Sequence, residues 1–398
     1  MIRKSLGFFL ALCISTVNPA HSGSILSSKG FGIPLPPPDA RSLAMGGISF
    51  AQPDPISISG TNPAALFPVQ TTLLSIRFGH EHTRTRAVEG TASSVYSNFS
   101  GFAFVLPFKR GLGLSLQLTP LTRRDYRLEF RNSVNEKAYT KSVQGEGGHN
   151  MASLTVYWQV HPVLSLGLSG QYIFGRANET WSIHWDDTDI FTPTDNLYSA
   201  KSSGTGWTAG LLMRPHRAWM VGGVFSPRVR LHSKTDLFYG SVQETEDINL
   251  QVPGFWGVSV SVIRRVAVWG LEYTRQNWDE TAIRGYRIPG MRATQRIAAG
   301  VEFYSFVDPF ASYWKRMAYR FGIGYQPFFT TDPEGRDIQE LWGTIGFGFP
   351  ILAGSSRLDV GLGFGKRGSF SANGISENLI RMNCTVTVGE KWFSRGTE

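Results

Sequence analysis

The sequence has few cysteines and few charged residues, and each shortage excludes a class of protein. Only Cys13 and Cys384 are present among 398 residues, which excludes a small exported domain held together by several disulfides. Charged residues make up 17%, against about 25% in an average soluble domain. After residue 22 no apolar run approaches the roughly 20 residues of a transmembrane helix. A membrane protein built from this chain would therefore have to close a β-barrel to pair its backbone groups.

The first 22 residues have the features of an export signal. Arg3 and Lys4 give a basic start, Leu6 to Val17 form an apolar core, and Ala20-His21-Ser22 is a small-residue cleavage site. The core is too short to cross a bilayer as a helix. We therefore expect residues 1–22 to be a signal peptide.

The formal net charge of +9 raises the question of a nucleic-acid partner. The basic residues gather at tight turns and in polar stretches, however, and form no stripe along one helix. This distribution argues against nucleic acid. It predicts outer-membrane lipid and the phosphates of lipopolysaccharide as partners.

The stretch Gly111–Thr119 shows the pattern that repeats through the rest of the chain. Leu112, Leu114, Leu116 and Leu118 occupy every second position, with small or polar residues between them. Such alternation is typical of a β-strand with one apolar face. We count fourteen candidate strands of this kind from Thr71 to the C-terminal end, so that residues 71–398 form one unit.

The connections between these strands alternate in length, which favours a barrel over a soluble sandwich. Short turns recur about every fifty residues, and long polar stretches separate them at 82–94, 122–150, 175–203, 226–250 and 275–292. Outer-membrane barrels combine short periplasmic turns with longer external loops. The sequence predicts an all-β protein, a transmembrane antiparallel up-and-down β-barrel of about 14 strands in the bacterial outer membrane.

Residues 23–70 lack the strand pattern and predict a compact N-terminal hatch. The run Pro36-Pro37-Pro38 makes a stiff lead-in, and Asp39 is placed to cap a short helix that Gly46-Gly47 would end. A second short helix is expected after Asn62, with Pro63 at its first position. The lumen of the barrel is the expected place for such a segment.

Three motifs resemble chemical sites without the context that those sites need. Gly363–Gly368 matches a dinucleotide fingerprint, but it ends a strand and enters Ser369–Asn378, whose sequence is typical of a loop. His80 and His82 share a strand face with no third ligand, and Asp186–Asp189 lacks the spacing of a calcium loop. We therefore predict no catalytic residue, no metal site, no cofactor and no enzymatic activity. Six tryptophans are expected in a bilayer-interface girdle: Trp181, Trp185, Trp207, Trp219, Trp269 and Trp278.

Four short motifs resemble the FadL (long-chain fatty-acid transporter) family and its PorV-like relatives. They are Arg41-Ser42-Leu43-Ala44-Met45-Gly46-Gly47, Asn62-Pro63-Ala64, Val252-Pro253-Gly254-Phe255-Trp256-Gly257 and Glu390-Lys391-Trp392-Phe393. The resemblance implies a fourteen-stranded barrel closed by its N-terminal hatch, with Gly46, Gly47, Asn62, Pro63 and Ala64 as hatch residues. The Pro-rich lead-in departs from the fatty-acid transporters.

Two functions follow from this resemblance. The first is passive uptake of hydrophobic, fatty-acid-like small molecules, with Leu43, Met45 and Leu66 lining an apolar pocket. The second is a PorV-like docking or shuttle role, in which external parts of the barrel bind proteins of a secretion system. An elongated apolar cavity in the lumen would favour uptake, and a sealed lumen would favour docking.

Overall fold

The structure is a computed structural model that describes residues 24–37, 39–88, 90–109, 111–134, 136–186, 194–239, 242–303, 311–351 and 355–390. The expected signal peptide, residues 1–22, lies outside these ranges, as do residues 391–393 of the last motif. No helix in the described ranges has the length and apolarity needed to cross a membrane.

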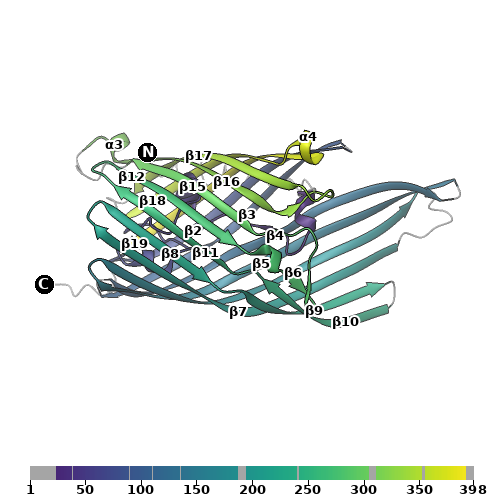
Figure 1. Cartoon of the computed structure of the whole chain (residues 1–398), viewed down its shortest axis with the longest axis horizontal. Coiled ribbons are helices and arrows are strands. Elements are labelled where there is room, and N and C mark those ends of the chain that lie inside the picture. The colour runs from purple at the N-terminus through teal and green to yellow at the C-terminus, as the bar shows by residue number, and fades with distance from the viewer. Residues whose placement is uncertain are drawn as a thin grey trace.

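The described residues form a closed antiparallel barrel of fourteen strands, which confirms the predicted fold class (Figure 1). Each strand pairs with the next, and the last strand closes the barrel on the first through the register Cys384↔Phe78. The barrel strands are β2 (Thr72–Ala87), β3 (Gly90–Lys109), β4 (Leu112–Val134), β5 (Lys137–His161), β6 (Leu164–Trp185), β7 (Thr194–His216), β8 (Trp219–Ser226), β11 (Phe255–Ile263), β12 (Ala267–Gln276), β15 (Thr294–Phe303), β16 (Ala318–Thr331), β17 (Asp337–Ile351), β18 (Ser356–Arg367) and β19 (Ile375–Glu390).

Alternate side chains of each barrel strand face the lipid and the lumen. On β5, Leu154, Val156 and Trp158 are exposed on the outer face, while Thr155 and Tyr157 are buried in the lumen. An outward apolar face is what a lipid environment requires of a barrel. The tryptophan prediction holds in part. Trp207, Trp219 and Trp269 are exposed on the outer face of the barrel. Trp181 lies on the distal half of β6, on the same face as the buried Ile173, and Trp278 is buried against Phe329, so the assignment of these two to the girdle was wrong.

Several stretches predicted as long loops are strands, and this expectation was wrong. β4, β5, β6 and β7 contain 23, 25, 22 and 23 residues, although a bilayer needs about 9–11. Their distal halves cover most of 122–150 and 175–203. Beyond the bilayer water reaches the outer face, so the apolar–polar alternation that reveals a strand in sequence is lost there.

A further hairpin widens this extension on one side. β9 (Val229–Tyr239) and β10 (Val242–Val252) pair with each other, and β9 also pairs with β7 from Asn196 to Ser203. We call the distal halves of β4–β7 together with β9 and β10 the outer sheet. It stands well beyond the rim that the other barrel strands reach, and Figure 1 shows it as the long flared side of the molecule.

Short helices and strands lie in several connections between the barrel strands. η3 (Trp278–Glu280), β13 (Ala282–Ile283) and β14 (Tyr286–Arg287) lie between β12 and β15, and α4 (Phe370–Asn373) joins β18 to β19. α3 (Tyr313–Arg316) precedes β16 at the other end, where the short turns mark the periplasmic side.

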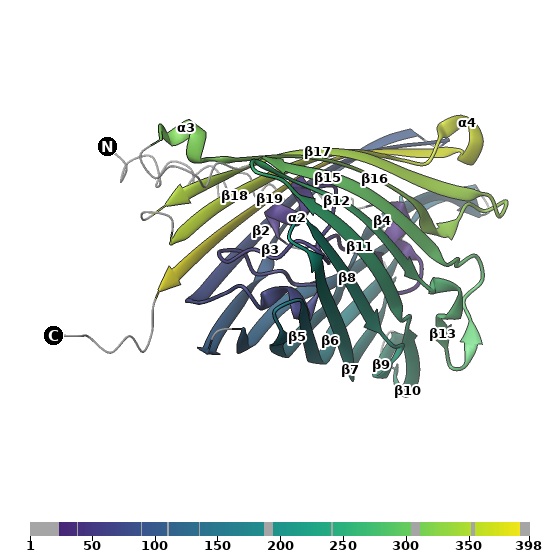
Figure 2. The ribbon, with the colours of Figure 1, turned by 60° about the vertical axis from the view of Figure 1, so that its left-hand side comes forward.

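Residues 24–70 run through the lumen from the outer end to the periplasmic end. The segment contains η1 (Ile25–Ser28), β1 (Ile33–Pro34), α2 (Ala40–Ala44) and η2 (Pro63–Leu66). η1 contacts β4, α2 contacts β16–β19, and η2 contacts β5–β7, so the segment reaches strands around the barrel (Figure 2). The segment therefore packs against the inner wall at several heights of the barrel.

Candidate functional site

The first half of the lumenal segment is held by a capped helix that ends on two glycines. Asp39 Oδ1 accepts a hydrogen bond from the Ser42 backbone N–H (2.8 Å), as an N-cap does. The helix α2 ends before Gly46 and Gly47, whose φ angles of 76° and 96° are strained for other residues. A Cβ on Gly46 would also stand 2.7 Å from the carbonyl oxygen of Ile323. The positive φ angle therefore favours glycine at both positions. At Gly46 the close approach of the barrel wall also leaves no room for a side chain.

The barrel wall offers glycines of its own where α2 docks. A Cβ on Gly300 would lie 2.4 Å from the Met45 carbonyl oxygen, and one on Gly322 would lie 2.0 Å from the Gly46 nitrogen. Gly346 and Gly361 meet Ala44 and Ala40 in the same way, at 2.3 Å and 2.6 Å. These four glycines form a docking floor on β15–β18. The sequence analysis did not identify these glycines, although their spacing among large apolar residues of the same strands could have indicated a close approach of another segment.

We expect Gly322→Val to displace the lumenal segment while the barrel still forms. Its side chain would overlap the backbone at Gly46, and overpacking of this kind typically costs about 1–3 kcal/mol. Gly343→Val is the matched control, because nothing lies within 4 Å of a Cβ at that β17 glycine. Limited proteolysis of the folded protein measures the effect. Equal protease resistance of the two variants would show that the docking floor does not hold the segment.

Six buried charged side chains form a closed ring near the periplasmic end, which we call the ion ring. Signs alternate around it, and each neighbouring pair lies within 3.5 Å: Arg41–Glu302 (2.7 Å), Glu302–Arg320 (3.4 Å), Arg320–Asp359 (2.7 Å), Asp359–Arg357 (2.9 Å), Arg357–Asp54 (2.9 Å) and Asp54–Arg41 (3.5 Å). Arg41 and Asp54 come from the lumenal segment, and the other four come from β15, β16 and β18. The ring therefore joins the segment to three strands through balanced charges.

Asp54 is held as a carboxylate within this ring. Burial raises the pKa of the Asp54 carboxyl, and the guanidinium groups of Arg357 and Arg41 lower it by more, so that the pKa lies well below its ordinary value. Buried charges that lose their partner are costly, whereas paired ones are tolerated. Removal of one ring member therefore has a larger effect than its single contact suggests.

A second anchor holds the turn that follows α2. Glu272 Oε2 on β12 accepts hydrogen bonds from the backbone N–H groups of Ser49 (2.7 Å) and Phe50 (2.9 Å). The other oxygen of Glu272 pairs with Arg296 on β15 (2.5 Å), which also donates to the Gly47 carbonyl (3.2 Å). One buried carboxylate on β12, the strand next to β15, thus fixes the backbone of the segment.

The predicted motif Asn62-Pro63-Ala64 begins η2 at the periplasmic end. Asn62 Oδ1 accepts from the Ala64 N–H (2.9 Å), and Asn62 Nδ2 donates to the carbonyl oxygens of Phe50 (2.6 Å) and Leu211 (3.2 Å). Gly167 and Gly210 on β6 and β7 leave the space that this turn occupies. Asn62 therefore links two parts of the segment to the barrel wall.

The outer half of the lumen contains a second set of alternating charges, which we call the ion chain. Its contacts run Arg123–Glu81 (2.6 Å), Glu81–Arg381 (2.6 Å), Arg381–Glu340 (2.9 Å), Glu340–Arg367 (3.1 Å) and Arg367–Glu377 (2.8 Å). All six residues belong to barrel strands, and Ser24 Oγ donates to Glu377 (2.5 Å). The start of the described segment is therefore attached to this chain.

An apolar cluster covers the lumen at its outer end. It combines Leu26, Phe31 and Ile33 of the lumenal segment with buried side chains of the wall and the outer connections. The latter are Ile173, Val229, Leu231, Val252, Trp278, Met291, Phe328, Phe329 and Ile338. We call this cluster the outer cap. It is held mainly by burial of apolar surface, which scales with the area removed from water.

The three residues predicted to line one ligand pocket are buried at separate places. Met45 packs with Ile48 and Ala298, and Leu66 packs with Ile58 and Leu73 near the periplasmic end. Leu43 lies against Gly363. None of the three lines the cavity on β6, β7, β9 and β10 or the cavity beside β1 and β4. Their role in ligand binding thus stays a prediction.

The two histidines with metal-like spacing have ordinary cross-strand partners. His80 Nδ1 contacts Ser97 Oγ and His82 Nε2 contacts Ser93 Oγ, each at 2.8 Å. Asp186 pairs with Arg131 (2.8 Å), and residues 187–189 lie outside the described ranges. In the part of the chain that the structure describes, no three metal-binding side chains gather.

Solved outer-membrane channels share this architecture. A Pseudomonas aeruginosa FadL homologue matches with a TM-score of 0.62 and 12% identity, over 90% of this chain and 99% of its own. The Pseudomonas putida toluene transporter TodX matches with 0.59 and 13%, over 90% and 99%. The Ralstonia pickettii toluene transporter TbuX matches with 0.58 and 13%, over 88% and 97%. At such low identity these likenesses establish the fold.

The barrel, its lipid-facing exterior and its filled lumen define the class: this is an outer-membrane β-barrel with the FadL fold. Two of these three solved proteins are toluene transporters. The sequence also matches the BamG family over residues 1–397, and the chain belongs to that family. The comparison with curated proteins gave no match.

Proposed function

We propose that the protein is a closed, plugged barrel that presents its outer sheet as a docking surface for other proteins at the cell surface. The observation that carries this proposal is the outer sheet itself. β4–β7 continue for roughly 12 residues beyond what a bilayer requires, or about 30 Å for tilted strands. Anchoring in the membrane needs no such wall. The conformational entropy lost in ordering these extra residues therefore indicates a role outside the bilayer.

Both edges of the outer sheet support a docking role. β4 pairs with β5 on one side, and among the described residues no strand pairs with its other edge from Tyr126 to Val134. β10 likewise has no registered strand on its far edge from Val242 to Ile248 within the described ranges. Open edges present unpaired backbone groups to which a strand of a partner can add.

The contents of the lumen favour docking over an open pore. The outer cap, the ion chain and the ion ring follow one another along the lumenal segment and tie it to the wall at both ends. A solute passing through the lumen would have to displace buried paired charges, which is costly. The segment is therefore better suited to closing the barrel than to guiding a continuous flux.

The docking proposal is tested by photo-crosslinking in intact cells. A photoreactive residue is placed at Glu244 on β10 or Asn132 on β4, both exposed at open edges, with Arg265 in a periplasmic turn as control. We expect a discrete protein adduct from the edge positions and none from the same partner at Arg265. Absence of adducts at both edges would contradict docking through the outer sheet.

Uptake of hydrophobic small molecules is the second candidate, favoured by a side gap in the wall. β3 and β4 pair no further outward than Phe102↔Leu118, and β1 fills the place beside β4 at Thr122 and Arg123. A cavity of about 40 Å³ lies there, lined in part by Leu35, Pro36 and Tyr96. Protein-dependent uptake of a radiolabelled fatty acid or of toluene by cells would favour this function over docking.

A further inference from the structure

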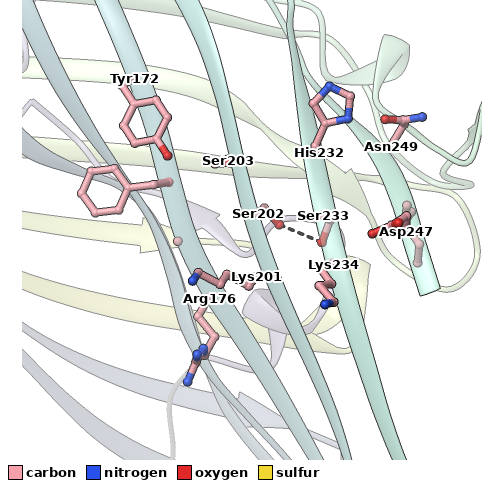
Figure 3. A pocket seen from close by; sticks show the side chains of 13 residues that line it. Tyr172, Arg176, Lys201, Ser202, Ser203, His232, Ser233, Lys234, Asp247 and Asn249 are labelled. Carbon is pink, nitrogen blue, oxygen red and sulfur yellow. Dashed lines mark hydrogen bonds between the residues drawn. The ribbon is translucent and has the colours of Figure 1, made fainter. Parts of the chain in front are cut away.

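The outer face of the flared side contains a second, larger cavity whose charge is unusual for a sheet surface. It has a volume of about 900 Å³ and is lined by residues of β6, β7, β9 and β10 (Figure 3). Side chains at these positions alternate with buried ones, and Lys201 shares its face with the exposed Trp207 of β7. The cavity therefore opens on the outside of the barrel wall.

Three basic residues lie directly opposite one another on adjacent strands across this cavity. The registers Arg176↔Lys201 and Lys201↔Lys234 place them in one row, and Lys234↔Asp247 ends the row with a carboxylate. Like charges directly opposite across strands are destabilising. In the described part of the chain, none of the three basic residues forms an ion pair that would offset this repulsion. The arrangement is explained if an anion occupies the row.

The neighbouring rows add aromatic and neutral polar groups. Phe174, Ser203, His232 and Asn249 form the next row towards the membrane, and the ring of Phe174 stacks on Tyr172 at 5.7 Å. Asp236 lies one row further out, where it accepts a hydrogen bond from Thr245. Positive charge therefore still prevails in the cavity, with aromatic rings below it.

The height of the row along the barrel indicates the source of the anion. Arg176 is twelve residues beyond Leu164, the periplasmic end of β6, so it lies about 30 Å from that end for a tilted strand. The apolar band of such barrels is about 25 Å tall and is bordered by aromatic residues. The basic row thus lies just beyond the aromatic border, at the level of the outer-leaflet headgroups.

We propose that the row Arg176–Lys201–Lys234 binds the phosphorylated headgroup of an outer-leaflet glycolipid of the lipid A type, with its acyl chains along the aromatic face below. Arg and Lys form strong charge-assisted hydrogen bonds to phosphate oxygens. The acyl chains of the same molecule would run down past Tyr172 and Trp207. This site does not depend on the docking role, because its three basic residues lie on the outer face of β6, β7 and β9, which are paired on both sides at these positions.

The proposal is tested on the full chain folded in detergent micelles and titrated with lipid A, followed by native mass spectrometry. K201Q/K234Q removes two phosphate contacts and should weaken lipid A binding roughly tenfold or more. K201R/K234R keeps the charge and should bind as the unchanged protein does. R264Q/R265Q makes the same charge change in an exposed periplasmic turn and should bind normally.

Thermal unfolding provides a second readout, in which lipid A is expected to reverse the order of stability of the two proteins. Without lipid A, K201Q/K234Q should unfold at a higher temperature than the unchanged protein, because cross-strand repulsion is relieved. With lipid A, the unchanged protein should gain stability and the double variant should not. Equal lipid A binding by the Gln variant, equal binding of dephosphorylated lipid A, or equal displacement by inorganic phosphate or an acidic peptide would each overturn the proposal.

Discussion

Removal of residues 40–66 is expected to convert a closed barrel into one that passes ions and small polar solutes. Eight strands make a lumen that side chains alone can fill, while sixteen to eighteen leave an aqueous channel. A fourteen-stranded barrel lies close to the open case, so its closure depends on the lumenal segment. Planar-bilayer conductance of the deletion and of the unchanged protein measures the difference.

The barrel should survive this deletion because its inner charges stay balanced. Loss of Arg41 and Asp54 leaves Glu302, Arg320, Arg357 and Asp359 in the ion ring, two of each sign. A second variant, in which residues 40–66 are replaced by a Gly/Ser segment of equal length, separates loss of the plug from shortening of the chain. Both variants should conduct. If neither conducts, the wall itself closes the lumen and residues 40–66 are not the plug.

The strands that face lipid could be predicted from sequence, and the strands that face water could not. On β5, Leu154, Val156 and Trp158 alternate with small or polar residues because one face meets lipid and the other meets the lumen. The same strand between Lys137 and Gln144 has no apolar face, so its sequence resembles a loop. The outer sheet therefore became visible only in the structure.

The buried charges show a second limit of sequence reasoning. Glu302, Arg320 and Asp359 occupy lumenal positions of strands whose pattern was read correctly, yet nothing in the pattern shows which of them pair. Two of the ion-ring contacts join the lumenal segment to strands far along the chain: Arg41 pairs with Glu302, 261 residues away, and Asp54 pairs with Arg357, 303 residues away. Local signals such as the Asp39 cap and the Asn62-Pro63 turn were readable because both partners lie within three residues.

The ion ring leads to the second prediction: Arg41→Leu should release the lumenal segment from the wall. Arg41 is 8% exposed and donates to Glu302 (2.8 Å) and to the Gln52 carbonyl (2.8 Å). Its loss leaves five ring members with an excess negative charge in a buried place. Breaking a buried ion pair from one side typically costs about 3–5 kcal/mol. This is enough to detach a locally stable segment without unfolding the barrel.

A compensating substitution distinguishes charge imbalance from lost packing. Asp54→Asn in the Arg41→Leu background removes the second segment charge, and the ring is again neutral, with two charges of each sign. Because the pKa of Asp54 lies well below its ordinary value, this carboxyl is charged at neutral pH and its neutralisation is a real change of charge. We expect Arg41→Leu to conduct in planar bilayers and to expose residues 40–66 to protease, and the double variant to recover much of the closed, resistant state. If the double variant is as open as Arg41→Leu, the arginine acts through its packing and hydrogen bonds, and charge balance in the ring does not hold the plug.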